Sequence, residues 1–202
     1  MMNVKSITAF VLSNPIVFNQ VRKLIAGDQA NTKDFIKNAL IKYRVKSVLD
    51  VGCGTGDFFE AVPTTVNYLG IDINKQFILF ARSHYGSKNN QFITQDLTSN
   101  QFSLKQKFDA VLLISMLHHL SDIELETILS KIKKITTKVV IIADIIPEPP
   151  GPLRKLMVKM DQGKYIRKSG DKLKILAKYF SIEEKKLVFS RLAVQFGVIC
   201  TP

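Results

Sequence analysis

The sequence predicts an α/β fold built on a doubly wound, mostly parallel sheet of seven strands. Short apolar runs alternate with amphipathic helical segments along the chain, which is the pattern of a parallel sheet covered by helices. The run at 108–114 is apolar apart from Asp109, as expected of a strand that is buried on both faces. A glycine-rich turn at 52–56 follows the first apolar run and opens a helix, and ligands bind at such turns.

The composition is that of an ordinary globular protein, with 46% hydrophobic and 23% charged residues among 202. No apolar run approaches the roughly 18 residues of a membrane span. The N-terminal apolar patch at 9–12 is broken at once by polar residues and Pro15, which argues against a signal peptide. Cys53 and Cys200 lie far apart, so we expect neither a disulfide framework nor a zinc site, and we expect a reducing, cytoplasmic location.

Two helices are expected before the first strand. Pro15 opens the first and Gly27 follows its last turn. Asn31 or Thr32 is expected to cap the second. The apolar faces are predicted to carry Val17, Val21 and Leu24 in the first helix, and Phe35, Ile36, Ala39 and Leu40 in the second.

The middle of the chain is predicted to contain strands and helices in alternation. Asn74 is expected to cap a helix that reaches Tyr85. Ser121 and Glu124 fit a capping box, which opens a helix with apolar residues at core spacing. The expected strands are 46–51, 66–71, 91–94, 108–114 and 138–143, and a short helix is expected from 56 to 61.

The last third of the chain is predicted to cross over and close the sheet. A proline-rich stretch at 147–152 forms the crossover, and Leu153, Leu156, Met157 and Met160 follow it at helical spacing. Two apolar stretches, 182–190 and 192–200, are expected to form a hairpin. Before the hairpin, a helix at 171–180 should face inward with Leu173, Leu176, Ala177 and Phe180.

Three types of glycine turn compete for residues 52–56. A phosphate loop requires a Lys-Ser/Thr pair after its last glycine, and none follows. A dinucleotide fingerprint requires glycine at position 57, where this chain has Asp57, and a carboxylate there would repel a pyrophosphate. The third pattern is Asp-x-Gly-x-Gly-x-Gly directly after an apolar strand, and residues 50–56 match it.

This third pattern resembles that of class I S-adenosylmethionine-dependent methyltransferases. The resemblance extends to Asp72 after the second strand, to Asp96 after the third, and to 108–120, which match the fourth-strand motif. It covers 46–145 and implies a Rossmann-like methyltransferase fold with a C-terminal antiparallel hairpin. We therefore expect a single domain, in which 1–44 form a helical lid, 45–145 the cofactor-binding core, and 146–202 the substrate-side helices and hairpin.

The resemblance also implies S-adenosylmethionine as cofactor and assigns roles around it. Asp72 would accept from the ribose hydroxyls, Asp96 from the adenine amine, and the Leu97 amide would face the adenine ring. Asp50 would orient the turn or bind the amino group, unless it merely caps the turn; Arg22 is either a clamp for the cofactor carboxylate or an ordinary solvated side chain. The expected cofactor-binding residues are Asp50, Val51, Gly52, Cys53, Gly54, Gly56, Asp72, Ile73, Asp96, Leu97 and Ser115.

Methyl transfer from a sulfonium chiefly requires alignment and exclusion of water, and it requires a general base only when the acceptor must lose a proton. The candidates are His119 and His118 after the fourth strand and Asp144 at the end of the fifth. A structural role at the entry of the following helix is the alternative for both histidines. We expect no metal in the site.

The substrate is less defined than the cofactor. The net charge of +12 divides into +5 for 1–50, −1 for 51–100, 0 for 101–150 and +8 for 151–202. The excess is either solvated helix surface or a site for an anionic small molecule or acidic carrier protein. RNA is an alternative substrate. A non-catalytic cofactor-binding protein is a further alternative, whereas the glycine pattern disfavours a nicotinamide oxidoreductase. The basic residues of the segment are Arg154, Lys155, Lys159, Lys164, Arg167, Lys168, Lys172, Lys174 and Lys178.

Overall fold

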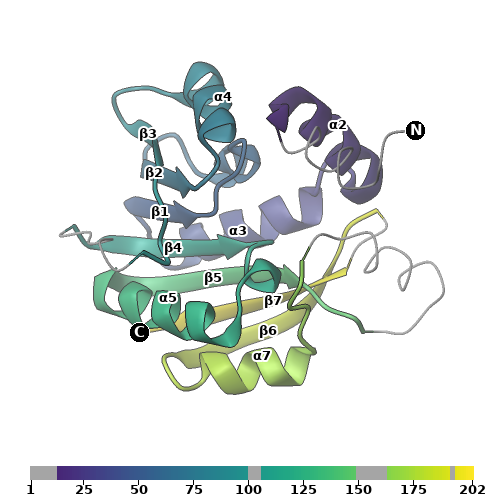
Figure 1. Ribbon diagram of the computed structural model, residues 1–202. Coiled ribbons are helices and arrows are strands. Elements are labelled where there is room, and N and C mark those ends of the chain that lie inside the picture. The colour runs from purple at the N-terminus through teal and green to yellow at the C-terminus, as the bar shows by residue number, and fades with distance from the viewer. Residues whose placement is uncertain (1–12, 100–105, 149–162, 192–193) are drawn as a thin grey trace, which may run out of the picture.

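A computed structural model describes residues 13–99, 106–148, 163–191 and 194–202 of the chain. These residues form one seven-stranded sheet in the order β3-β2-β1-β4-β5-β7-β6 (Figure 1). The strands β1 to β5 run parallel, whereas β7 pairs antiparallel with both β5 and β6. Their bounds are β1 Ser47–Val51, β2 Asn67–Asp72, β3 Asn90–Thr94, β4 Phe108–Ile114, β5 Thr136–Ile145, β6 Ser181–Phe189 and β7 Val194–Thr201.

Helices cover both faces of this sheet. In Figure 1, α5 and α7 lie in front of the sheet and α3 lies behind it. Two hydrophobic clusters fill the layers: one joins α3 and α4 to one face, and the other joins α5 and α7 to the opposite face. The bounds are α2 Pro15–Ala26, α3 Ala30–Lys42, η1 Asp57–Ala61, α4 Lys75–Tyr85, η2 Leu117–His119, α5 Asp122–Ile135 and α7 Ser169–Leu176.

The doubly wound, mostly parallel seven-stranded sheet predicted from the sequence is confirmed. The apolar run of β4 is central, between β1 and β5, and every residue of it except Asp109 is buried. The predicted caps of α4 and α5 also form, since Asn74 accepts from Gln76 and Phe77 and the Ser121 capping box closes. Because the parallel strands point in one direction, their carboxyl ends place the predicted site residues along one edge.

Two expectations about the N-terminal helices were wrong. The helix α3 begins at Ala30 rather than at a cap on Asn31 or Thr32, and Thr32 is a buried residue inside it. In α2, Val21 and Leu24 are exposed, because the helix turns a mixed face with Phe18, Asn19 and Arg22 toward the rest of the protein. The predicted face of α3, with Phe35, Ile36, Ala39 and Leu40, is buried as expected.

The last helix is shorter than predicted. It ends at Leu176, and turns rather than helix follow, so that Ala177 is exposed while Phe180 is buried. The predicted amphipathic segment at 153–160 lies outside the described residues. Strand β5 is longer than expected at both ends, and the remaining predicted boundaries agree within two residues. Among the described helices, none combines the length and the apolar character that crossing a membrane would need.

Candidate functional site

The glycine turn between β1 and η1 exposes backbone at the edge of the sheet. Ile71 of β2 holds its first residues, since the Ile71 carbonyl accepts from the amides of Gly52 at 2.8 Å and Cys53 at 3.1 Å. Gly54 and Gly56 have positive φ angles of 56° and 86°, which favour glycine. A Cβ at Gly56 would lie 2.9 Å from Tyr85, whereas a Cβ at Gly54 would meet no atom within 4 Å. The turn therefore presents Gly54 to open space.

Asp72 joins the end of β2 to this turn. Its Oδ2 accepts from the Gly54 amide at 2.8 Å, and its Oδ1 accepts from the Asn74 amide at 2.7 Å. Burial raises the pKa of Asp72, and these backbone hydrogen bonds oppose the rise. The backbone N–H of Ile73 is a third donor to this carboxylate. An ionised carboxylate has about four lone-pair sites, so Asp72 keeps room for a further donor. The neighbouring Ile73 is 70% exposed and places an apolar surface beside that carboxylate.

Asp50 lies beneath the turn and is 1% exposed. The hydroxyl of Tyr68 donates to its Oδ2 at 2.6 Å. Burial raises the pKa of Asp50 to about 7, although the hydrogen bond from Tyr68 works against the rise and the charge of Asp72 adds to it. Val51 and Cys53 are also buried, and burial raises the pKa of the Cys53 thiol well above its usual range.

Asp96 and Leu97 follow β3, which pairs with β2. Asp96 is engaged locally, because Thr98 donates to its Oδ1 from its hydroxyl at 2.6 Å and from its amide at 2.8 Å. The hydrogen bond from the Thr98 hydroxyl is the main cause of a lowered pKa at Asp96. The Leu97 side chain is buried and its carbonyl accepts from Lys131 at 3.0 Å. The fold thus places Asp50, Asp72 and Asp96 at the ends of three adjacent strands.

Helix α2 contacts the glycine turn through polar side chains. Arg22 pairs with Asp57 at 2.6 Å, and the hydroxyl of Thr55 lies 2.7 Å from Asn19 and 3.0 Å from Asp57. Phe18 stacks against Phe77 of α4 with ring centroids 4.7 Å apart. The Nε atom of Arg22 is buried and has no hydrogen-bond partner in the described part of the chain. Arg22 is thus no freely solvated side chain, and burial lowers its pKa.

The three candidate catalytic residues separate into two environments. His118 is buried, and its Nδ1 lies 2.5 Å from Oδ1 of Asp144, which is 0% exposed. His119 is exposed, and its ring lies against that of His118 with centroids 4.1 Å apart and planes tilted by 45°. The other oxygen of Asp144 accepts from Lys172 of α7, a residue that the sequence analysis had counted only as one of the basic segment.

Two functional candidates escaped the sequence analysis. Lys172 stands four residues before the buried Leu176, so both lie on one face of α7. This spacing was the signal for the burial of Lys172. Gln195 interrupts the apolar β7, and its Nε2 donates to Ser115 at 2.6 Å. Ser115 itself has a positive φ of 52° at the end of β4.

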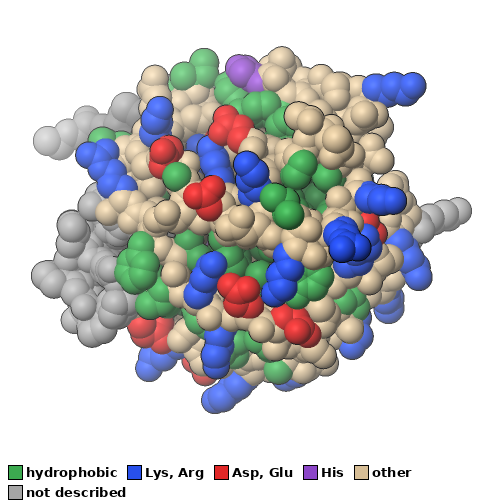
Figure 2. All heavy atoms as spheres, turned by 180° about the vertical axis from the view of Figure 1, so that it is seen from behind, with side chains coloured by type: hydrophobic (Ala, Val, Ile, Leu, Met, Phe, Trp, Pro, Cys, Tyr) green, Lys and Arg blue, Asp and Glu red, His purple; other side chains and the backbone are tan. Residues whose placement is uncertain are grey.

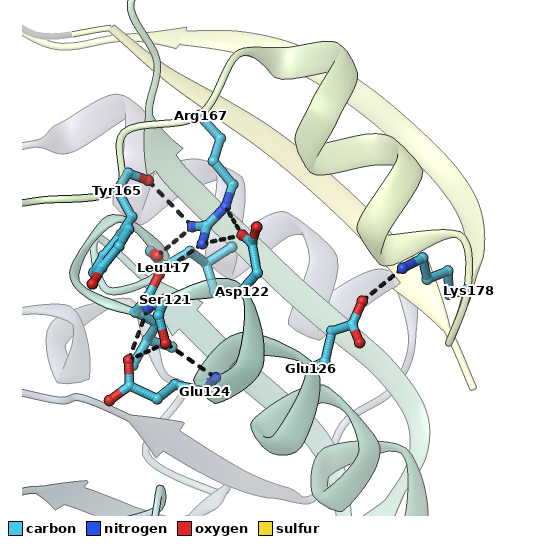
Figure 3. Close-up of polar contacts among 9 residues, drawn as sticks. Leu117, Ser121, Asp122, Glu124, Glu126, Tyr165, Arg167 and Lys178 are labelled. Atoms are coloured by element: carbon cyan, nitrogen blue, oxygen red, sulfur yellow. Dashed lines mark hydrogen bonds and ion pairs between the residues drawn. The ribbon is translucent and has the colours of Figure 1, made fainter.

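Arg167 belongs to the protein's own framework rather than to a free basic surface. Figure 3 shows its guanidinium directed at Asp122 and at backbone carbonyls around η2. It donates to Asp122 at 2.7 and 2.9 Å, to Leu117 at 3.0 Å and to Leu120 at 2.7 Å. Lys178 pairs with Glu126 at 2.6 Å in the same view. Arg154, Lys155 and Lys159 lie outside the described residues, while Lys164 and Lys168 are exposed.

Neither cysteine forms a disulfide, and both Cys53 and Cys200 are buried thiols. Within the described ranges, no cluster of three or more histidine, cysteine or acidic side chains is arranged to hold a metal ion.

Comparison with known proteins finds similarity over the part of the chain that contains this site. Residues 48–138 match the family model described as a methyltransferase domain, and this range contains the glycine turn, Asp50, Asp72 and Asp96. Phosphoethanolamine N-methyltransferase 1 of Triticum aestivum is 33% identical over 100 residues, which are 48% of this chain. The match spans only 20% of that relative's length.

Solved structures share the whole fold at lower identity. A magnesium protoporphyrin IX methyltransferase from Synechocystis PCC 6803 with bound SAH is similar with a TM-score of 0.67 and 23% identity, over 84% of this chain and 81% of that one. An S-adenosylmethionine-dependent methyltransferase from Clostridium acetobutylicum is similar with a TM-score of 0.72 and 13% identity, over 91% and 97%. Residues 48–138 are thus similar to methyltransferase domains, and the sheet around the glycine turn is the fold that these solved methyltransferases share.

Proposed function

We propose that this protein is an S-adenosylmethionine-dependent methyltransferase that methylates an oxygen or nitrogen atom of a small molecule by in-line displacement. The observation that carries the proposal is the hydrogen bond from the Gly54 amide to Asp72, by which the carboxylate at the end of β2 holds the exposed glycine turn after β1. This contact brings backbone and carboxylate groups together at the carboxyl edge of a parallel sheet, where ligands bind.

The residues present fit this cofactor. The open space above Gly54 leaves room for its methionine portion, and the carboxylate of Asp72 can accept from the ribose hydroxyls. The exposed side chain of Ile73 offers an apolar surface for the adenine ring, and Asp96 offers a carboxylate beyond it. When bound, the cofactor supplies an electrophilic methyl group on a sulfonium sulfur, whose departure leaves a neutral thioether.

The chain's own contribution to the reaction is alignment, with a base where the acceptor carries a proton. Ser115 and His118 follow β4, and Asp144 lies near the end of β5. Met116, between the first two, lies 3.2 Å from where a Cβ of Gly52 would be, so this region adjoins the glycine turn. Asp144 is an acceptor for His118, because the hydrogen bonds and charges of His118 and Lys172 outweigh its burial and lower its pKa. We therefore assign His118, oriented by Asp144, as the group that takes the acceptor's proton, and His119 as a substrate contact at the exposed edge.

The helix α2 is proposed to act as a lid over the methionine end. Asn19 and Arg22 support this proposal, since they touch Thr55 and Asp57 at the start of η1. Residues 1–12, which complete the proposed lid, lie outside the described residues. The two free thiols, Cys53 and Cys200, support a reducing, cytoplasmic location.

An anionic small molecule is the substrate class that we favour. Lys164 and Lys168 remain exposed near η2, whereas Arg167, Lys172 and Lys178 are engaged within the protein. The relatives named above act, by their names, on phosphoethanolamine and on magnesium protoporphyrin IX, of which the first carries a phosphate. RNA is less favoured, because Arg167, Lys172 and Lys178 of the basic segment are engaged in ion pairs within the protein. The rear face, which Figure 2 shows, carries lysines and arginines scattered among acidic and apolar side chains.

The proposed cofactor and activity are tested separately. Titration calorimetry should show binding of S-adenosylmethionine and none of NAD, and binding of NAD alone would refute the cofactor. Methyl transfer from labelled cofactor is then screened against pools of small metabolites and of transfer and ribosomal RNA. Label in the metabolite pool would support the proposal. Label in RNA would show that the substrate is RNA instead of a small molecule. Cofactor binding without transfer to either pool would favour the alternative of a non-catalytic binding protein.

The anionic substrate is tested with Lys164→Glu and Lys168→Glu together. If these lysines receive the substrate, its KM should rise at least about tenfold, while the Kd for S-adenosylmethionine stays unchanged. The matched control is Lys37→Glu on α3, an exposed lysine on another element. An unchanged KM in the double variant would remove these residues from the substrate site. Arg167 is unsuitable for this test, because its substitution would also release the carbonyls of Leu117 and Leu120.

A further inference from the structure

Three uncharged polar side chains form a hydrogen-bonded chain at the carboxyl edge of the sheet. Thr32 of α3 is 0% exposed, Gln195 of β7 is 5% exposed, and Ser115 directly follows β4. The hydroxyl of Thr32 donates to Oε1 of Gln195 at 2.7 Å, and Nε2 of Gln195 donates to Oγ of Ser115 at 2.6 Å. Gln195 thus connects a helix that covers the sheet to the end of the central strand β4.

The amide of Gln195 is buried in a strand that is otherwise apolar. The other buried residues of β7 are apolar or glycine, namely Val194, Phe196, Gly197, Val198, Ile199 and Cys200. Burial of an amide is unfavourable unless its polar groups are hydrogen-bonded. An apolar side chain would fill this position without that cost, so packing alone does not require a glutamine here.

Ser115 has an unusual backbone conformation where β4 reaches the glycine turn. Its φ of 52° lies in the left-handed region, and non-glycine residues held there cluster at functional sites. Its amide donates to the Ala143 carbonyl of β5 at 2.8 Å. The next residue, Met116, lies 3.2 Å from where a Cβ of Gly52 would be. Ser115 is therefore held where β4 adjoins the turn that is proposed to receive the methionine portion of the cofactor.

The direction of the hydrogen bonds leaves one donor for a ligand. A serine hydroxyl has one O–H donor and two acceptor lone pairs. Because Gln195 presents an N–H group, Ser115 accepts this bond and keeps its own proton. Thr32 fixes this arrangement, since its donation to Oε1 turns Nε2 toward Ser115. Among the residues that the structure describes, none accepts the proton of the Ser115 hydroxyl.

The chemistry of the cofactor indicates which group would accept this proton. At its methionine end, S-adenosylmethionine carries an ammonium, a sulfonium and a carboxylate. The ammonium and the sulfonium are cations that accept no hydrogen bond from a hydroxyl, whereas an ionised carboxylate only accepts. A hydroxyl donor at this end of the site is therefore complementary to the carboxylate alone.

We propose that Gln195 is a positioning residue for the cofactor. Its donation to Ser115 directs the Ser115 hydroxyl proton at the carboxylate of S-adenosylmethionine, and Thr32 holds the amide in that orientation. This inference rests on the proposed function, because it requires the cofactor to bind at the glycine turn. It extends the cofactor site to β7, a strand that carries none of the cofactor-binding residues expected from the sequence.

The contact of Ser115 is tested by titration calorimetry with S-adenosylmethionine and with decarboxylated S-adenosylmethionine, which differ only by the carboxylate. In Ser115→Ala, the Kd for S-adenosylmethionine should rise about tenfold or more, since the lost hydrogen bond is to a charged group. The Kd for the decarboxylated compound should stay unchanged. The control is Ser83→Ala, an exposed serine on α4, which should change neither Kd. An equal loss for both compounds, or a loss for neither, would overturn the carboxylate contact.

The role of Gln195 is tested with Gln195→Met, which keeps the length of the side chain and removes its hydrogen-bonding groups. The Ser115 hydroxyl can then turn away from the ligand, so the Kd for S-adenosylmethionine should rise about threefold to tenfold and that for the decarboxylated compound should not. In the Ser115→Ala background, the same change should have no further effect on either Kd. A role in packing alone would weaken both compounds equally and would persist without the hydroxyl, and that result would overturn the positioning role.

Thr32→Val is a second variant, which nearly preserves the shape of the buried side chain. It leaves Oε1 of Gln195 without its donor, and a buried acceptor without a partner is unfavourable. The Ser115 hydroxyl should then donate to Gln195 instead of to the ligand, so the preference for S-adenosylmethionine over the decarboxylated compound should fall. Thermal unfolding verifies that each variant is folded. An unchanged preference in Thr32→Val would show that Thr32 does not hold the amide.

The two affinities of the unaltered protein separate this inference from the function on which it rests. The unaltered protein should bind S-adenosylmethionine at least about tenfold more tightly than the decarboxylated compound. Equal affinity for both would refute the carboxylate contact and leave the proposed cofactor in place. Binding of neither compound would refute the proposed function itself, and this inference with it.

Discussion

At the scale of single residues, Asp72 has two tasks that the same carboxylate performs at once. It accepts the amide of Gly54 and that of Asn74, and so connects the glycine turn, β2 and α4. The proposed ribose contacts would use the lone pairs that remain. Its loss should therefore affect the shape of the turn as well as the direct contacts with the ligand.

Asp72→Ala is expected to weaken S-adenosylmethionine binding roughly 10- to 100-fold or more, since a hydrogen bond to a charged group contributes about 1.5 to 3 kcal/mol. The measurement is titration calorimetry, with far-UV circular dichroism to verify the fold. Asp34→Ala, an exposed acidic residue on α3, is the matched control. Near-normal affinity of Asp72→Ala would place the ribose elsewhere.

Asp50 couples the stability of the fold to pH. Its folded-state pKa of about 7 lies above the ordinary value of 3.8, so between these values the folded state binds more protons than the unfolded state. The contribution of Asp50 to the free energy of unfolding therefore falls as the pH rises from about 4 to about 7. In total this amounts to about 4 kcal/mol, since each pH unit corresponds to about 1.4 kcal/mol.

Asp50→Asn should remove this dependence while it keeps an acceptor for the Tyr68 hydroxyl. Urea unfolding at pH 5 and pH 8 is the measurement. From pH 5 to pH 8, the free energy of unfolding of the unaltered protein should fall relative to that of the variant by up to about 3 kcal/mol. The same difference at both pH values would show that Asp50 is not protonated in the fold at pH 5.

At the scale of elements, the sequence predicted that α2 is a helix, but it did not predict which face of that helix is buried. Its start at Pro15 and its end before Gly27 follow from local rules, because Asn14 accepts from the amides of Ile16 and Val17 and Gly27 adopts a positive φ. Its inward face is decided by the partners that η1 offers. Asp57 draws Arg22 inward, and the apolar Leu24 stays 68% exposed.

Arg22 is expected to anchor α2 to the turn through Asp57. Arg22→Met and Asp57→Asn should then weaken S-adenosylmethionine binding to a similar degree, and the double variant no further, with a coupling of roughly 1 kcal/mol. Calorimetry on the four proteins of this cycle gives the coupling, and Lys33→Met, which breaks the other ion pair to η1, is the control. If Arg22→Met weakens binding and Asp57→Asn does not, Arg22 contacts the cofactor directly.

The helix α7 illustrates a further limit of local patterns. A lysine among Leu173, Leu176 and Phe180 was counted as surface charge, because lysine is seldom buried. Its burial depends on Asp144, which stands 28 residues earlier on β5. No property of the segment 169–176 alone identifies that carboxylate as its partner.

At the scale of the whole molecule, the cofactor should stabilise the entire sheet, because the proposed site joins the ends of β1, β2 and β3 to α2. A ligand that binds only the folded protein adds about 2.7 kcal/mol at 100 times its Kd. For a domain of this size, S-adenosylmethionine should therefore raise Tm by about 5 to 10 °C. Thermal unfolding with and without the compound is the measurement, and an equal rise with NAD would contradict the expected specificity.

Much of the architecture could be predicted because it is encoded in local patterns. Apolar runs predict β4 and β5, and capping residues predict α4 and α5. The spacing from Asp50 to Gly56 predicts the turn and its resemblance to methyltransferases. These signals depend on neighbours within a few residues of one another. The order of the strands and the antiparallel return of β7 agreed with the family's fold once that family was recognised.

The sequence by itself predicted the fold class, the resemblance to methyltransferases and the strand-end carboxylates that frame the proposed cofactor site. Only the tertiary structure decided which polar groups meet. It pairs Arg22 with Asp57, Gln195 with Ser115, and Lys172 with Asp144. The physical reason is that backbone periodicity and capping are short-range properties, whereas the charge and tautomer of a buried group depend on partners that the folded sheet brings from distant parts of the chain.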